Sequence, residues 1–231
     1  MQNTEIQELI NEIEFLGLKE SLSYIAQKYE SKVVFTSSFG QEDQVIADAI
    51  FTQNLEISVI TLDTGRLFQE TYDLMDATRA KYKVAIKPYF PNNQNIEKLT
   101  QSKGFNSFYE SVENRKECCF FRKIEPLKRA LAGQQVWITG LRAEQSENRN
   151  AMALLEWDDG NNILKFNPLI HWSYEQVLDY LKINRVPDNP LHRKGFVSIG
   201  CQPCTRAIAA DEHPRAGRWW WENSKKECGL H

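Results

Sequence analysis

The sequence predicts an α/β fold, a mostly parallel sheet with helices on both faces. Short β-branched runs alternate with longer helical segments along most of the chain. This alternation is typical of βαβ units, in which consecutive strands lie parallel. The chain has 231 residues and 42% hydrophobic content, enough to bury a sizeable core. We therefore expect a single domain over residues 1–231.

The first segment, residues 1–29, is expected to be an N-terminal helical region. Ile6, Ile10 and Ile13 recur at helical spacing, and the pattern continues to about residue 29. Gly17 interrupts it. One or two amphipathic helices over residues 5–29 are predicted.

The following segments alternate between strand and helix. The strands are β-branched and short, and the helices carry apolar residues at helical spacing. The expected strands are residues 32–36, 57–60, 84–86 and 136–139, and the expected helices are residues 42–51, 67–82 and 124–132.

The last third begins with a predicted hairpin, residues 153–157 and 163–166 around a polar loop that contains Gly160. Ser173 is a predicted N-cap for a helix that runs to about residue 183. Residues 187–231 are rich in Pro, Gly, Arg and Trp and carry little periodicity, so an irregular C-terminal segment is expected.

The net charge and the hydropathy of the chain limit the kinds of partner that we expect. The net charge is -3, which gives no global basic field of the kind that nucleic-acid binders carry. The N-terminus is polar and acidic, and no stretch reaches the roughly 18 apolar residues that cross a bilayer. We expect a cytoplasmic protein with no nucleic-acid and no membrane partner; a homo-oligomer stays open.

Two turns that follow predicted strands suit an anion. In a parallel sheet, ligands bind at the carboxyl ends of strands, near helix N-termini. The first turn is Ser37, Ser38, Phe39 and Gly40, and the second is Leu62, Asp63, Thr64, Gly65 and Arg66. Neither matches the dinucleotide or the Walker pattern, and ordinary loop chemistry is the alternative.

Basic residues accumulate near the cysteines and after one predicted strand. Guanidinium groups bind phosphate and sulfate bidentately, so several of them suit a substrate with more than one anionic group. A solvated surface is the alternative for each one. The candidates are Lys123, Arg142, Arg149, Arg206, Arg215 and Arg218.

Four of the five cysteines form two pairs, Cys118-Cys119 and Cys201-Gln202-Pro203-Cys204. In a reducing cytosol, metal ligation explains such pairs better than disulfides do. Zinc and iron–sulfur clusters both accept four thiolates, so the spacing does not choose between them. Structural disulfides, or a buried role for the vicinal pair, are the alternatives.

The fifth cysteine, Cys228, stands alone near the chain end. Lys225 and Lys226 favour its thiolate, whereas Glu227 opposes it. A terminal position can carry a thiol into a site and out to a partner, although a stray terminal cysteine is the alternative. The apolar run of residues 219–221, Trp-Trp-Trp, is expected to anchor this segment to the domain.

Taken together, these motifs identify a resemblance. The chain resembles the assimilatory adenylyl-sulfate reductases, relatives of the phosphoadenylyl-sulfate reductases. The matching motifs lie between about residue 30 and the last residue: residues 37–43, 62–66, 115–119, 200–206, 217–222 and 226–231.

The resemblance implies a modified pyrophosphatase-loop fold of the adenine nucleotide alpha hydrolase type. It implies that residues 37–40, with Asp43, lie near the phosphosulfate and that residues 62–66 lie near the nucleotide. It makes Lys123, Arg142, Arg206, Arg215 and Arg218 candidates for contacts with substrate or with the cluster. The C-terminal segment then becomes a cluster-binding and catalytic tail, and Cys118, Cys119, Cys201 and Cys204 are expected to hold a [4Fe–4S] cluster.

The same resemblance implies a reaction in sulfate assimilation and cysteine biosynthesis. Cys228 attacks the sulfur of adenylyl sulfate, AMP leaves, and thioredoxin or a glutaredoxin-like dithiol releases sulfite from the S-sulfocysteine. The four paired cysteines imply a preference for adenylyl sulfate, with activity on phosphoadenylyl sulfate, alone or in addition, as the alternative. Two rivals from other classes are an ATP-using adenylyltransferase or thiolation enzyme of the same fold and a zinc-binding module.

Overall fold

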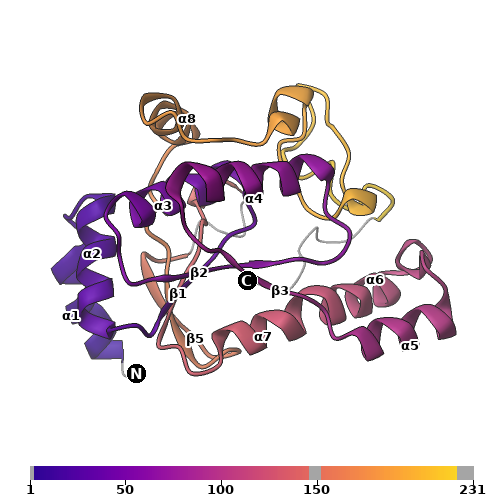
Figure 1. Cartoon of the computed structure of the whole chain (residues 1–231), viewed down its shortest axis with the longest axis horizontal. Coiled ribbons are helices and arrows are strands. Elements are labelled where there is room, and N and C mark those ends of the chain that lie inside the picture. Colours follow the sequence, from indigo (N-terminus) through magenta and orange to yellow (C-terminus); the bar gives the residue numbers. More distant parts are fainter. Residues whose placement is uncertain (1–2, 146–151, 223–231) are drawn as a thin grey trace. The chain divides into compact units, whose positions relative to one another are not determined.

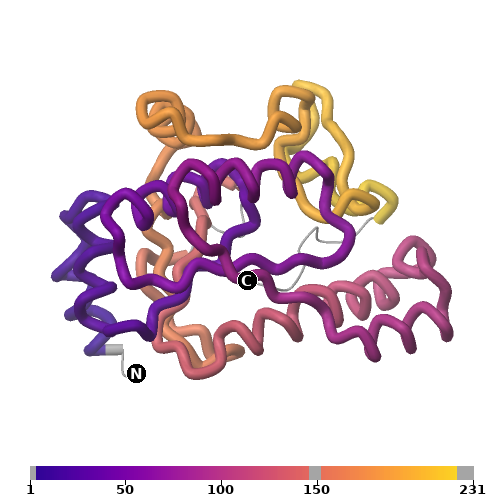
Figure 2. Tube along the Cα trace, in the orientation of Figure 1, coloured from indigo at the N-terminus to yellow at the C-terminus, as the bar shows by residue number. Residues whose placement is uncertain are grey.

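The computed structural model describes residues 3–145 and 152–222 (Figures 1 and 2). The chain divides into two compact units that are interleaved in sequence. Unit 1 combines Met1–Thr61, Leu74–Lys87 and Leu131–Asp188. Unit 2 combines Leu62–Asp73, Pro88–Ala130 and Asn189–His231. The expectation of a single domain stays a prediction.

A six-stranded sheet confirms the predicted fold class. Its strand order is β3-β2-β1-β4-β6-β5. β1 pairs in parallel with β2 and β4, β4 pairs in parallel with β6, and β5 and β6 form the predicted antiparallel hairpin. The strands are β1 Val33–Thr36, β2 Ser58–Leu62, β3 Lys87–Tyr89, β4 Val136–Ile138, β5 Leu155–Asp158 and β6 Ile163–Phe166.

The core of unit 1 lies against this sheet. In β1, Phe35 pairs with Ile138 of β4, which in turn pairs with Phe166 of β6. All three side chains have no exposed surface. Strands covered on both faces read as continuous apolar runs, which is why β1 shows no alternation in the sequence.

The helices of unit 1 begin where the sequence predicts. α1 (Asn3–Ile13) and α2 (Leu18–Tyr29) are separate helices because Gly17 is the N-cap of the second. α3 (Gln41–Thr52) follows the first predicted anion turn. Ser173 caps α8 (Tyr174–Ile183) with a capping box that Gln176 completes. α4 (Gln69–Tyr82) contributes residues to both units.

Unit 2 contains helices that the sequence did not reveal. They are α5 (Asn93–Lys103), capped by Asn92, and α6 (Val112–Cys119), capped by Ser111. α6 continues through a π-helical turn, Phe120–Ile124, into α7 (Glu125–Leu131) (Figure 1). The described part of the C-terminal segment is irregular as expected, with short 3₁₀ turns such as Gln202–Cys204.

The predicted strand at residues 84–86 is wrong. The strand is β3, which begins at Lys87 and contains Pro88. Ile86 packs instead against the core of unit 1. Proline is tolerated because β3 is an edge strand. Because β3 contains few apolar residues, the sequence pattern did not reveal this strand. Within the described residues, no helix combines the length and the apolar character needed to cross a membrane.

Candidate active site

The turn after β1 is organised around one carboxylate of α3. Asp43 Oδ2 accepts hydrogen bonds from the Ser38 backbone N–H at 2.5 Å and from the Ser38 hydroxyl at 2.7 Å. Phe39 takes a positive φ of 61°, and its N–H donates to Ser37 Oγ at 3.2 Å. Gly40 is the N-cap of α3. The predicted anion turn is therefore a fixed loop at a helix N-terminus.

Asp43 itself is buried, and burial raises its pKa to about 6 although its bonds to Ser38 oppose the shift. The residue that follows β4, also in unit 1, lies close to the Asp43 carboxylate. A Cβ on Gly140, just after β4, would lie 2.1 Å from Asp43 Oδ1, so only glycine fits there. The sequence places Gly140 after a strand but does not reveal this close approach.

Arg142 lies beside the same loop. Its Nε donates to Glu42 Oε1 at 2.9 Å, and its Nη1 donates to Glu144 Oε2 at 2.9 Å. The guanidinium also lies over the Tyr174 ring, 5.4 Å from the centroid. The carboxylates of Glu42 and Glu144 thus hold Arg142, a predicted substrate-binding residue, next to the N-terminus of α3.

The second predicted turn, residues 62–66, belongs to unit 2 and is held by its own side chains. Asp63 Oδ1 accepts from the Gly65 N–H at 2.8 Å and from the Tyr72 hydroxyl at 2.9 Å. Burial, and then the bond to Asp63, raises the pKa of Tyr72 to about 12. Gly65 has a φ of 70°, which glycine adopts without strain.

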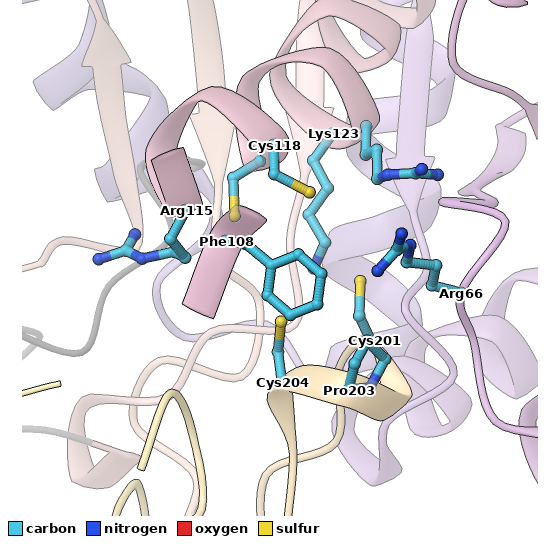
Figure 3. Close-up of a pocket in the computed structure, with 10 residues that line it drawn as sticks. Arg66, Phe108, Arg115, Cys118, Lys123, Cys201, Pro203 and Cys204 are labelled. Carbon is cyan, nitrogen blue, oxygen red and sulfur yellow. The ribbon is translucent and has the colours of Figure 1, made fainter. Parts of the chain in front are cut away.

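Unit 2 brings the two cysteine pairs together. Cys118 and Cys119 from the end of α6, and Cys201 and Cys204 from the turn Gln202–Cys204, line one pocket (Figure 3). The space among these residues measures about 310 Å³, a volume that includes open solvent and is not an enclosed cavity. The prediction that these pairs are two halves of one site is consistent with this arrangement.

Basic side chains also line the pocket. Figure 3 shows Lys123 reaching from the π-helical turn toward the space between the cysteines, and Arg66 also lines this pocket. Arg122 Nη1 donates to the Thr64 carbonyl oxygen at 2.6 Å. The π turn follows Cys119 directly, so it sets the direction of both Arg122 and Lys123.

The cysteine site needs positive charge to hold thiolates. Burial, followed by the negative charge of Cys201 and Cys119, raises the pKa of Cys204 to about 12. Burial also raises the pKa of Cys118, which Arg122 opposes. A metal centre held by these cysteines would supply positive charge and displace these protons.

The donor set of the pocket fits an iron–sulfur cluster, because four thiols line it and thiolates are the ligands that such clusters take. Among the described residues, no group of three or more His, Cys, Asp or Glu side chains has the geometry of a metal-ion site. The buried indole N–H groups of Trp219 and Trp221 have no hydrogen-bond partner there, and both rings pack in the cysteine cluster. The Thr64 hydroxyl and Cys201 Sγ are 3.2 Å apart. These polar groups suit the sulfurs of an iron–sulfur cluster.

The other basic residues that the sequence analysis selected differ in their surroundings. Arg218 is buried and lies over Trp219, whereas Arg206 forms an ion pair with Glu212 at 2.6 Å. None of Arg206, Arg215 and Arg218 lines the cysteine pocket. Arg149 and Cys228 lie outside the described residues.

Comparison with known proteins gives a consistent result. The chain is 50% identical over 217 residues, 94% of its length, to the adenosine 5'-phosphosulfate reductase of Agrobacterium fabrum and covers 83% of that protein. It is 49% identical over 213 residues, 92% of its length, to the protein of the same name from Allochromatium vinosum, of which it also covers 83%.

Solved structures agree on the fold. A phosphoadenylyl-sulfate reductase from Candida auris in complex with phosphate superposes with a TM-score of 0.77 at 28% identity, covering 90% of this chain and 98% of that one. An FMN adenylyltransferase from Candida glabrata in complex with ATP has a TM-score of 0.55 at 16% identity over 86% of this chain and 62% of that one, and shares the fold alone. Residues 32–207 match the phosphoadenosine phosphosulfate reductase domain, and the chain belongs to that family.

Proposed function

We propose that the protein reduces adenylyl sulfate to sulfite and AMP with electrons from a dithiol. The observation that carries the proposal is the pocket lined by four cysteines and Lys123 in a chain that also has a fixed anion turn at residues 37–40. Relatives that are about 50% identical over most of the chain are named adenosine 5'-phosphosulfate reductases. Sulfate assimilation is the process that this reaction serves.

Cys118, Cys119, Cys201 and Cys204 are the proposed ligands of a [4Fe–4S] cluster. The cluster supplies a fixed positive centre among the thiolates and tunes the electrostatics of the site when bound. Lys123 and Arg122 compensate the remaining negative charge of the sulfurs, since both line the same pocket and Arg122 opposes the rise in the pKa of Cys118.

The proposed nucleophile is Cys228. Its thiolate attacks the sulfuryl sulfur, an S–S bond forms, and the S–O bond breaks with its electron pair leaving on AMP. One thiol of thioredoxin or a glutaredoxin-like donor then attacks Cys228 Sγ and expels sulfite, and the second thiol closes a disulfide on the donor. Attack of an anion on an anion is opposed by charge, so cations and the N-terminus of α3 must surround the transferred group.

The residues proposed to contact substrate are those that can supply positive charge or backbone N–H groups to its anionic parts. Residues 37–40, with Asp43 holding their conformation, bind the phosphosulfate, and residues 62–66 bind the nucleotide. Lys123, Arg142, Arg206, Arg215 and Arg218 are the proposed cationic contacts. For Arg142 and Arg206, a substrate anion has to compete with the carboxylates that hold each of them.

The test is a single incubation of anaerobically purified protein with adenylyl sulfate and without a dithiol. We expect released AMP and a gain of one SO₃ group on the peptide that contains Cys228, and no adduct in the Cys228→Ser variant, which still binds AMP. No adduct on wild-type protein with its full iron content removes the mechanism.

The preferred substrate is adenylyl sulfate rather than phosphoadenylyl sulfate. Support comes from the relatives named above and from the presence of all four paired cysteines. The ratio of kcat/KM for the two nucleotides measures the preference, and a strong bias to the 3'-phosphorylated one would overturn it. We also place the protein in the cytoplasm, where dithiol donors are kept reduced.

A further inference from the structure

Strand β6 of unit 1 contains a buried lysine where the sheet would accept an apolar residue. The side chain of Lys165 is only 4% exposed. The other residues of the strand are buried and apolar: Ile163, Leu164 and Phe166. Burial of a charge costs free energy unless a partner compensates it. The apolar core alone therefore does not explain a charged residue at this position.

Lys165 links the two strands on either side of it. Its Nζ lies 2.9 Å from Glu156 Oε1 of β5, and these two residues are direct partners in the antiparallel register. The same Nζ lies 5.8 Å from the centroid of the Trp137 ring, and Trp137 of β4 is the partner of Lys165 in the parallel register. A cation within about 6 Å of an indole ring is attracted to its face. The ammonium group therefore connects β5 to β4.

Trp137 extends this connection to β1. The residue is 1% exposed, and its indole N–H donates to Thr36 Oγ1 at 2.8 Å. Thr36 lies two residues after Val34, the partner of Trp137, and alternate residues of a strand share a face of the sheet. Side chains of four adjacent strands are thus in contact, and we call them the cross-sheet row: Glu156, Lys165, Trp137 and Thr36.

The cross-sheet row ends at the base of the first anion turn. Thr36 is the last residue of β1 and directly precedes Ser37. The Ser37 N–H donates to the Ile60 carbonyl oxygen at 2.8 Å, and Ser37 Oγ accepts from the Phe39 N–H at 3.2 Å. Thr36 and Ser37 therefore fix the direction in which the chain leaves the sheet and enters the turn.

We infer that the cross-sheet row positions the anion turn at residues 37–40, with Lys165 and Trp137 as positioning residues for the bound phosphosulfate. This rests on the proposed function, in which that turn binds the phosphosulfate. Backbone N–H groups stabilise a transferred anion when they already point to the place that it will occupy, and a misplacement of about 1 Å can cost about 100-fold in rate. Within the row, the cation orients the Trp137 indole, and the indole N–H holds the Thr36 side chain at the base of the turn.

The experiment compares wild-type protein with Lys165→Met, both with their full iron content. Methionine fills a similar volume without the charge, so the Trp137 indole loses the cation that orients it. Hydrogen exchange is measured for the backbone amides of residues 37–40, and the Kd for adenylyl sulfate is measured in a Cys228→Ser background. We expect exchange at least about fivefold faster and a Kd at least about fivefold higher, while the amides of β2 keep their wild-type exchange.

The midpoint of urea unfolding separates this role from a merely structural one. Lys165→Met should keep the wild-type midpoint, because an apolar residue suits the buried position and Glu156, 29% exposed, stays hydrated. A merely structural lysine would give the opposite pair of results, a lower midpoint with an unchanged Kd.

The matched control is Lys28→Met. Lys28 belongs to the same unit and makes the same two kinds of contact outside the row, an ion pair with Glu12 at 2.8 Å and a cation over the Tyr24 ring at 5.4 Å from the centroid. Because neither contact joins the row, this variant should match the wild type in exchange at residues 37–40 and in Kd.

A pair of variants at Thr36 tests the other end of the row. Thr36→Val removes the acceptor of the Trp137 N–H and keeps the shape, so it should reproduce the faster exchange and the higher Kd of Lys165→Met. Thr36→Ser keeps the hydroxyl and should retain the wild-type values of both.

The outcomes are separable. Wild-type exchange at residues 37–40 or a wild-type Kd in folded Lys165→Met overturns the inference, and so does equal behaviour of Thr36→Val and Thr36→Ser. If Lys165→Met does not fold, the Thr36 pair decides alone. Absence of an SO₃ adduct on the wild-type protein overturns the proposed function instead, and the exchange rates then still show whether the row holds the turn, because they require no reaction.

Discussion

At the scale of single residues, Asp43 is the group on which the first anion turn depends. It accepts two hydrogen bonds from Ser38 and leaves room only for glycine at position 140. A negative charge here opposes an anionic substrate, while burial favours the neutral carboxyl. For the proposed reaction, we therefore expect Asp43 to act through the loop conformation rather than as a ligand of the anion.

The raised pKa of Asp43 has a consequence for stability. Its value is about 6 in the folded protein, against 3.8 as the ordinary value, so the folded state holds the proton more tightly. The stabilisation is full below pH 3.8 and is lost as the pH rises through about 6. Relative to Asp43→Asn, the wild type should lose up to about 3 kcal/mol of unfolding free energy across this window. Urea unfolding at several pH values measures the difference, and a difference that does not vary with pH contradicts the assignment.

Thr64 offers a second test at this scale. Its hydroxyl is 3.2 Å from Cys201 Sγ and also accepts from the Arg66 N–H. Thr64→Val removes both bonds and keeps the shape, so we expect the holo-protein to lose about 1 kcal/mol of stability and to release iron faster to a chelator. Thr64→Ser keeps the hydroxyl and should behave as the wild type. Equal iron release from the valine and serine variants would show that the hydroxyl has no role.

Sequence patterns nominate candidate site residues, but they do not reveal the contacts that hold these residues in place. The cysteine pairs and the two turns carry local patterns, so they could be identified without a structure. The bonds between Thr64 and Cys201, and between Arg115 and Glu222, join positions more than a hundred residues apart, and no local pattern encodes them. Gly140 is visible in the sequence, yet its role depends on a side chain of another element.

At the scale of elements, the π-helical turn Phe120–Ile124 is the feature that serves the site most directly. It separates α6, which ends in the vicinal cysteines, from α7. An extra residue in a helical turn rotates everything beyond it by about 100° relative to a regular helix, since α-helices have 3.6 residues per turn. The π turn therefore sets how Lys123 faces relative to Cys118.

Deletion of Phe120, whose ring is 42% exposed, tests this role. We expect the helix to become regular and Lys123 to leave the pocket, with a large loss of SO₃ transfer and a lower iron content, while the helix content by circular dichroism is kept. Phe120→Ala is the matched control and should retain both iron and activity. A deletion variant as active as the control would mean that the π turn does not orient the site.

The elements that the sequence missed share a physical cause. α5 buries only Leu99, so it lacks the apolar stripe by which a helix is recognised. β3 contains Lys87 and Pro88 and sits at the sheet edge, where few apolar side chains are needed. The central strands and α3 pack on both sides and could be predicted because burial leaves a pattern in the sequence.

At the scale of the whole molecule, the two units are stabilised by different means. Unit 1 has a large apolar core against the sheet. In unit 2, a smaller cluster of buried residues, Phe108, Cys119, Cys201, Cys204 and Trp219, joins α6 to the C-terminal segment. Burial, followed by the negative charge of Cys201 and Cys119, raises the pKa of Cys204, and burial raises the pKa of Cys118.

Removal of the metal centre should therefore loosen unit 2 selectively. After anaerobic treatment with a chelator, we expect backbone amides of residues 112–124 and 198–206 to exchange hydrogen at least tenfold faster, while β1 and β4 keep their protection. The reason is that metal ligation links segments about eighty residues apart, whereas the sheet depends on its own apolar contacts. Cys204→Ser, which removes one proposed ligand, should reproduce the pattern without a chelator. Equal loss of protection in both units would mean that the cysteine site supports the entire fold, and unchanged exchange in unit 2 would mean that its packing holds without metal.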